Sequence, residues 1–97
     1  MSYAVMSNWN SEKPIDEKSI GYAKSTLIPM LKLMGAKHAY LCGTGDNSFS
    51  VITIYPDEKT ATAAVAKQEA IRETATDLPI TLVNESRGKV LASLDEN

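Results

Sequence analysis

The sequence predicts a small α+β domain, and three observations lead to this class. The chain has 97 residues, of which 43% are hydrophobic, so it can bury one core and has no room for a second. Apolar residues recur at helical spacing in two segments. Four short runs around these segments favour β-strands. We therefore expect a single domain, spanning residues 1–97, in which helices pack on a sheet.

Three strands are predicted in the first half of the chain. Tyr3–Met6 is short, apolar and β-permissive, and the polar stretch Ser7–Lys13 that follows it predicts a loop. Lys37–Cys42 and Phe49–Tyr55 are two further strand-like runs. The residues between them, Gly43–Ser48, readily form turns, so these two runs predict a hairpin.

The first helix is predicted from about Asp16 to Met34, where apolar residues recur at helical spacing. Gly35 suits the position just after a helix end. Pro29 lies inside the pattern, removes one backbone hydrogen bond and costs about 3 kcal/mol in a regular helix. We therefore expect a kink between Ser25 and Pro29.

The second helix is predicted from Asp57, whose carboxylate can cap it, to Thr76. Small alanines on its buried face allow close packing on a sheet. That face is expected to consist of Ala61, Ala64, Val65, Gln68, Ile71 and Ala75. Leu78-Pro79 should end this helix.

The C-terminal part predicts one more strand in either of two forms. Ile80–Val83 and Val90–Ala92 favour a strand, and Asn84–Gly88 interrupts them. A single bulged strand and a short terminal hairpin both fit this pattern. The acidic tail Leu94–Asn97 is expected to fray.

The element order β-α-β-β-α-β predicts the split, ferredoxin-like arrangement, in which an antiparallel four-stranded sheet carries both helices on one face. The other face should then be polar if water covers it. The third predicted strand, however, has Val51 and Tyr55 on one side and Ile52 and Ile54 on the other. Because both sides are apolar, we expect the second face to be covered, and a second copy of the chain is the simplest cover.

Composition and charge exclude several classes of function. The chain has 10 Lys and Arg against 12 Asp and Glu, without the basic stripe that phosphate binding requires, so we expect no nucleic-acid partner. Cys42 is the only cysteine, which excludes an internal disulfide and a thiolate metal cluster. No stretch is apolar enough to span a membrane, and the first residues do not resemble a secretory leader. We therefore expect a cytoplasmic protein with no metal and no membrane partner.

The element order, the strand-to-helix passage Phe49–Glu58 and the closing Gly88–Leu91 carry a resemblance to a known superfamily. Nearly the whole chain resembles the dimeric α/β-barrel superfamily, which includes antibiotic-biosynthesis-monooxygenase-like proteins and many small bacterial proteins of unknown role. The resemblance implies a homodimer in which two sheets face each other, with a pocket between each sheet and its own helices or at the barrel mouth. Members include oxygenases without a cofactor, haem-degrading enzymes and isomerases, so the fold alone selects no function.

His38 is the only histidine and therefore the one candidate for an imidazole base, so we predict it as the catalytic residue. By strand alternation it shares a face with Tyr40 and Cys42. A structural position at the strand start, beside Lys37, is the alternative. Haem-degrading members place their ligand histidine on a later helix, and the second predicted helix has none, so we expect no haem and no other cofactor.

Five residues are candidates for binding a small apolar or aromatic molecule, namely Trp9, Asn10, Tyr22, Tyr40 and Tyr55. Trp9 and Asn10 follow the first predicted strand, where the superfamily often places pocket residues. The tyrosines can donate phenol hydroxyls to a ligand. Packing is the alternative for each: the tryptophan would anchor a loop over the core, and the tyrosines would fill the core or an interface.

Other reactive groups are expected to be structural. Cys42 has no evident activating partner, so we expect a buried, inert thiol. Arg72 and Arg87 are the only arginines, and we expect surface salt bridges for both.

Two functions remain open. The first is a homodimeric enzyme resembling the cofactor-independent monooxygenases or an isomerase, in which an electron-rich substrate supplies the electrons and the pocket supplies a base and a shape. The alternative is a non-catalytic ligand-binding or assembly module. A pocket of roughly 300 Å³ or more, lined by convergent polar groups, would favour the first.

Overall fold

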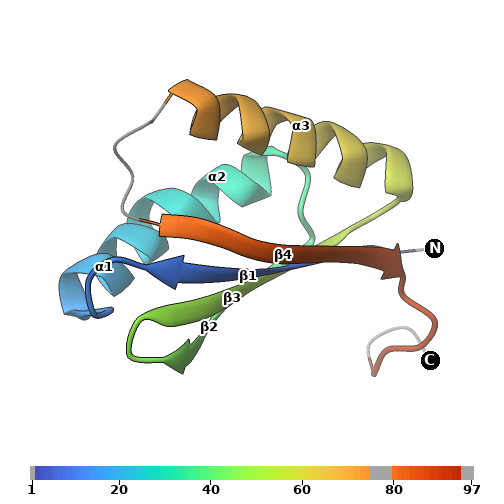
Figure 1. The fold of residues 1–97 in the computed structure, drawn as a ribbon. Helices are drawn as coiled ribbons and strands as arrows, with labels where there is room; N and C mark the ends of the chain where they lie inside the picture. The colour runs from blue at the N-terminus through green and yellow to red at the C-terminus, as the bar shows by residue number, and fades with distance from the viewer. Residues whose placement is uncertain (1, 75–79, 95–97) are drawn as a thin grey trace.

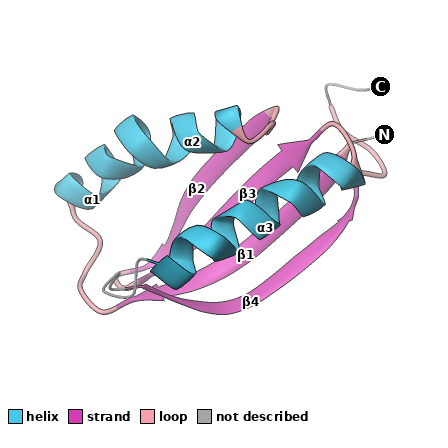
Figure 2. Ribbon diagram, turned by 90° about the horizontal axis from the view of Figure 1, so that it is seen from above, coloured by secondary structure: helices cyan, strands magenta, loops and turns pink. Residues whose placement is uncertain are grey.

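The structure is a computed structural model that describes residues 2–74 and 80–94 (Figure 1). Its elements are β1 (Tyr3–Ser11), α1 (Glu17–Tyr22), the π-helical segment η1 (Ala23–Leu27), α2 (Ile28–Leu33), β2 (His38–Gly45), β3 (Ser48–Tyr55), α3 (Glu58–Thr74) and β4 (Ile80–Lys89). The strands form one antiparallel sheet in the order β2-β3-β1-β4. Figure 2 shows both helical stretches over the same face of this sheet. The predicted α+β, ferredoxin-like fold is therefore confirmed.

β1 is longer than predicted, because it continues past Met6 to Ser11. Trp9 and Asn10 therefore lie inside a strand, and the predicted loop at this point was wrong. The reason is that the period of two continues through polar residues. The buried side chains of this alternation are Val5, Ser7 and Trp9, and the exposed ones are Met6, Asn8 and Asn10.

The hairpin of β2 and β3 is confirmed, but its turn is tighter than predicted. β2 extends to Gly45, and the chain turns at Asp46 and Asn47. The pairing register shifts between Gly43 and Gly45, which leaves Thr44 as an extra residue on β2. The strand therefore includes a bulge, a feature that glycine accommodates easily.

The irregularity that Pro29 predicts is present as the π-helical segment η1. Pro29 has no backbone N–H to donate to the carbonyl group of Ser25. One residue earlier, the N–H of Ile28 bonds to the carbonyl oxygen of Ala23, five residues back. Pro29 thus lies in the first turn of α2, directly after this wider turn.

α2 ends at a glycine, as predicted. Gly35 has a φ of 103°, in the region that favours glycine. Its N–H bonds to the carbonyl oxygen of Lys32 at 3.0 Å, and the N–H of Ala36 bonds to that of Leu31 at 3.1 Å. This pair of bonds is a Schellman motif, which satisfies carbonyl groups at the helix end.

The core lies between α3 and the strands β1 and β3. It is formed by Val5, Tyr55, Ala61, Ala64 and Val65. The predicted alanine face of α3 is therefore confirmed over these positions. Ile71, predicted on the same face, is exposed, and the axis of α3 diverges from the sheet towards its C-terminal end (Figure 1).

Of the two forms predicted for the C-terminal part, a bulged strand and a short hairpin, the structure has the bulged strand. β4 is one continuous strand with a bulge, and its register shifts so that Asn84 pairs with Asn8 while Leu82 pairs with Trp9. Val83 is thus the extra residue. Val90–Ala92, predicted as strand, lies outside β4. The predicted positions of Ala75, Thr76, Leu78-Pro79 and the last three residues of the tail lie outside the described residues.

The conformation and close packing of Gly35 predict that one added methyl group will lower the stability of the fold. A Cβ atom at Gly35 would lie 2.6 Å from Cγ2 of Thr60, and its backbone conformation disfavours any other residue. We expect Gly35→Ala to lower the free energy of unfolding by about 1 to 2 kcal/mol, measured by urea denaturation. Gly21→Ala is the matched control, because its Cβ meets nothing within 4 Å, and it should raise stability by about 0.5 to 1 kcal/mol. Equal stability of Gly35→Ala and the parent chain would contradict this account of the helix end.

Asp57 predicts a loss of stability in acid. Its carboxylate accepts the backbone N–H of Thr60 at 2.7 Å, and this bond lowers the pKa of Asp57 below its ordinary value of 3.8. Because the pKa is lower in the folded chain, the stabilisation is fully present above the ordinary value and is lost as the pH falls through the folded pKa. Asp57→Asn keeps a capping oxygen without the charge, so its free energy of unfolding should fall less steeply below about pH 4. Identical slopes for the two proteins in acid denaturant titrations would refute this role.

Candidate functional site

Three rows of paired residues cross the sheet on the face opposite the described helices. Residues that pair across neighbouring strands point to the same side of a sheet. Two rows, here called the apolar rows, consist of His38, Ile54, Ala4 and Gly88, and of Tyr40, Ile52, Met6 and Ser86. The third, here called the polar row, consists of Cys42, Ser50, Asn8 and Asn84. We call this whole surface the open face.

The apolar rows expose large side chains to water. Tyr40 is 54% exposed and Met6 is 40% exposed. Ile52, which lies between them on β3, and Ile54 in the neighbouring row of the same strand are half-buried. Apolar side chains that lie together on an exposed sheet face in this way make the face a candidate surface for association.

The polar row is held together by side-chain hydrogen bonds. The Ser50 hydroxyl donates to Oδ1 of Asn8 at 2.5 Å, and Nδ2 of Asn8 donates to Oδ1 of Asn84 at 2.7 Å. These bonds fix the Asn8 amide between its two neighbours. The row can therefore be covered by another surface at a smaller cost than unpaired amides would impose.

The helix-facing side holds an aromatic pair. The rings of Trp9 and Phe49 are stacked, with centroids 6.2 Å apart and planes 5° apart. The indole Nε1 of Trp9 donates to the hydroxyl oxygen of Ser7 at 2.8 Å. Trp9 is thus buried and hydrogen-bonded within its own strand, so it packs as its alternative prediction expected, but from a strand and not from a loop.

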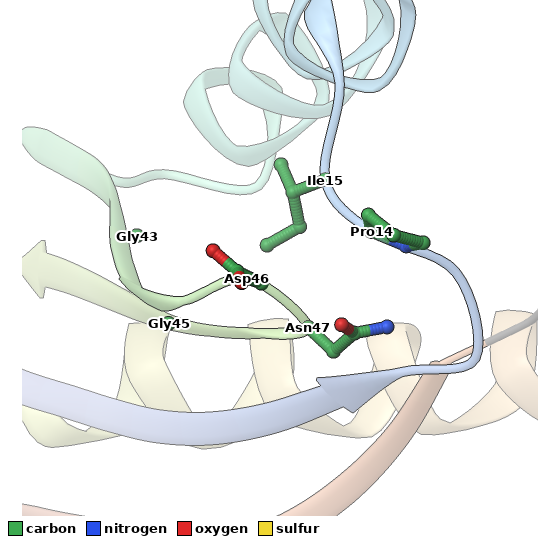
Figure 3. Close-up of a pocket in the computed structure, with 6 residues that line it drawn as sticks. All are labelled: Pro14, Ile15, Gly43, Gly45, Asp46 and Asn47. Atoms are coloured by element: carbon green, nitrogen blue, oxygen red, sulfur yellow. The ribbon is translucent and has the colours of Figure 1, made fainter.

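A pocket of about 370 Å³ lies at one end of the sheet (Figure 3). It is lined by Pro14, Ile15, Gly43, Gly45, Asp46 and Asn47. The segment before α1 forms one wall, and the β2–β3 hairpin forms the other. In Figure 3 the Ile15 side chain points towards Asp46 and the glycine backbone. We call this the hairpin pocket.

Backbone hydrogen bonds hold the two walls of the hairpin pocket together. The N–H of Ile15 donates to the carbonyl oxygen of Asp46 at 2.9 Å, and that of Ser11 donates to the carbonyl oxygen of Asn47 at 2.7 Å. The Asn47 amide also donates to the Ser11 carbonyl oxygen at 3.2 Å. These bonds fix the two walls of the pocket relative to each other.

A second, smaller pocket of about 170 Å³ lies where α2 passes into β2. It is lined by Ile28, Lys32, Ala36, Lys37, His38 and Ala39. His38 is the one predicted site residue that lines either of the two pockets.

The predicted site residues are distributed over both sides of the sheet. His38 and Tyr40 lie together on the open face, and Asn10 lies on the same face nearer the hairpin end. Tyr55 is fully buried under α3, where its hydroxyl accepts a hydrogen bond from the Gln68 amide at 3.3 Å. Trp9 also faces the helices, whereas the last candidate, Tyr22 on α1, is exposed. The structure therefore does not bring the six residues into one site.

Two further predictions have different outcomes. Cys42 is exposed, so the predicted buried thiol was wrong, because Cys42 lies on the open face and the helices cover the other one. The predicted ion pair of Arg87 is confirmed, with Glu85 at 2.5 Å. The Arg72 side chain lies outside the description.

The hairpin pocket was not predicted from the sequence, because its residues belong to no catalytic motif. The sequence feature that could have predicted this pocket is the size of its side chains. Two glycines close to a turn leave space on a strand surface, and a proline and an isoleucine before the first helix can wall it.

Two kinds of site are not found in the described part of the chain. Residues 2–74 and 80–94 contain no group of three or more metal-ligating side chains that could hold an ion. Across the same ranges, each helix is too short or too polar to cross a membrane.

Solved structures with this fold include proteins of known and unknown function. A dimeric ferredoxin-like protein from an uncultured marine organism has a TM-score of 0.68 at 13% identity, over 96% of this chain and 98% of that one. SnoaB from Streptomyces nogalater, a cofactor-independent oxygenase, has a TM-score of 0.65 at 14% identity, over 98% of both chains. A protein of unknown function from Nitrosomonas europaea has a TM-score of 0.64 at 18% identity, over 96% and 93%.

These likenesses confirm the ferredoxin-like fold. No protein-family model matches the chain. A comparison with curated proteins also finds no similar sequence.

The hydrogen bond between Ser7 and Trp9 predicts that two serine-to-alanine substitutions will lower the free energy of unfolding by different amounts. Ser7→Ala leaves the buried Trp9 indole without its serine acceptor and should lower the free energy of unfolding by about 1 to 3 kcal/mol. Ser25→Ala removes an exposed hydroxyl and should change it by less than about 0.5 kcal/mol. Urea denaturation followed by the fluorescence of Trp9, the only tryptophan, measures both. Equal costs would mean that the Ser7 bond contributes little to packing.

Proposed function

We propose that this chain is a homodimeric small-molecule-binding protein that holds a small aromatic molecule in the hairpin pocket. The single observation that carries the binding function is the pocket of about 370 Å³. Its volume falls in the range of roughly 300 to 1,000 Å³ typical of ligand sites, and the pocket beside His38, at about 170 Å³, does not.

The lining of the hairpin pocket suits a flat molecule with a hydrogen-bond donor. Ile15 and Pro14 supply apolar contact, and the bare backbone at Gly43 and Gly45 lets a ring approach the strand. The Asp46 carboxylate can accept hydrogen bonds but cannot donate them. A small phenol or aromatic amine meets both requirements, because its ring is apolar and its hydroxyl or amino group donates.

The open face supports assembly into a homodimer. Stacked sheets lie about 10 Å apart, so the apolar rows of two copies would interdigitate and remove Tyr40 and Met6 from water. The polar row would enter the interface already hydrogen-bonded. A structurally similar protein is itself described as a dimeric ferredoxin-like protein, which adds support.

A second candidate function is cofactor-independent oxygenation beside His38. The specific observation in its favour is that the only imidazole lines a pocket, in a fold that a cofactor-independent oxygenase also has. His38 would remove a proton from a CH₂ group activated by a phenolic ring. One O₂ would then convert that CH₂ group into a carbonyl group and release one water, so the substrate supplies all the electrons.

The first experiment measures mass and ligand binding together. Light scattering after size-exclusion chromatography should give about 21 kDa, twice the chain mass of 10.5 kDa. A panel of small phenols and aromatic amines should then include compounds that raise the melting temperature of the parent chain.

Three variants locate the binding site. Gly43→Val, whose Cβ meets nothing within 4 Å, should fill the pocket and abolish binding without loss of folding. Asp46→Asn should weaken binding of the same compounds at least several-fold. His38→Ala is the control and should bind as the parent chain does. Loss of binding in His38→Ala with retention in Gly43→Val would overturn the assignment and favour the second candidate, which O₂ uptake with the bound phenol would then test.

A further inference from the structure

The segment after β4, residues 90–94, carries two leucines that no described part of the chain covers. Leu91 is 89% exposed and Leu94 is 91% exposed. The segment has no regular secondary structure, and it leaves the sheet at the end of β4. We call it the tail. Scattered surface leucines are common, but here two of them lie three residues apart on one short segment at the end of the sheet.

The position of the tail relates it to the open face. The backbone N–H of Val90 donates to the carbonyl oxygen of Ser2 at 2.8 Å, so the first residue of the tail is held at the end of the sheet. Beyond that point the tail turns away from the helices, to the side of the sheet on which the open face lies (Figure 1). This is the side on which the proposed partner copy would stack.

We propose that in the homodimer the tail of each copy packs Leu91 and Leu94 against the partner copy, so that two symmetric tails clasp the stacked sheets. The inference rests on the homodimer proposed above. Two copies related by a two-fold axis present the same surfaces to each other, so one tail implies a second.

The length of the tail fits this role. Five residues in an extended conformation reach roughly 17 Å. Stacked sheets are separated by about 10 Å, so the tail can cross from one sheet to the edge of the other. A tail folded back on its own open face would bury its leucines within one copy, whereas in the structure both are almost fully exposed.

The test compares leucines on the two sides of the molecule. Leu91→Ser combined with Leu94→Ser should raise the dimer dissociation constant at least tenfold, measured by sedimentation equilibrium over a dilution series. Leu33→Ser is the matched control, because Leu33 is 88% exposed on α2, in the helical layer, and should leave the constant unchanged. Circular dichroism verifies that all variants are folded.

A crosslinking experiment identifies what the tail contacts. Leu94→p-benzoylphenylalanine should give, on irradiation, a covalent species of about 21 kDa on a denaturing gel, and the same residue at position 33 should not. Crosslinking within one chain only, or an unchanged dissociation constant in the double leucine variant, would overturn the clasp.

One further variant separates the clasp from the dimer itself. Tyr40→Glu places a charge in the apolar rows and should convert the parent dimer into monomers. If Tyr40→Glu dissociates the dimer while the double leucine variant does not, the tail contact is refuted and the proposed homodimer stands. A parent chain that is monomeric at all concentrations overturns the proposed homodimer, and the clasp with it.

Discussion

The alternation of side chains along β1 determines how the rest of the molecule is arranged. β1 is a central strand and pairs with both β3 and β4. Its period of two sends Val5 into the core beneath α3 and Met6 to the opposite surface. A slip by one residue would exchange the two sets and place Asn8 under a helix. One register therefore defines both the core and the surface available for assembly.

Polar groups occur on both sides of this strand, and each side satisfies them locally. On the covered side, the Ser7 hydroxyl receives the Trp9 indole N–H. On the other side, Asn8 is tied to strands β3 and β4 by its own amide. Among the described residues, every buried side-chain nitrogen and oxygen has a hydrogen-bond partner. The strand can thus carry serine and asparagine without the cost of an orphaned polar group.

The order of elements could be predicted from the sequence because its signals are local. Periodicity, Gly35 after α2 and the turn residues of the β2–β3 hairpin each act within a few positions. The extent of β1 could not be predicted in this way. Serine is common in loops, and only the contacts of Ser7 with Trp9 and with β3 explain why it lies in a strand. Strand alternation placed His38 and Tyr40 on one face, but only the fold shows which face the helices leave open. The hairpin pocket depends on the approach of Ile15 to Asp46, and no local pattern encodes a contact between residues so far apart in the chain.

The bulges at Thr44 and Val83 have a consequence for the size of any assembly. They lie on β2 and β4, the two outer strands of the sheet. An outer strand with an uninterrupted row of free amide and carbonyl groups is a template for lateral growth, in which one sheet after another joins edge to edge into a fibre. A bulge breaks that row and twists the strand away from a flat partner. Because both outer strands are interrupted in this way, edge-to-edge growth is disfavoured, and the open face is left as the surface for the proposed association of two copies.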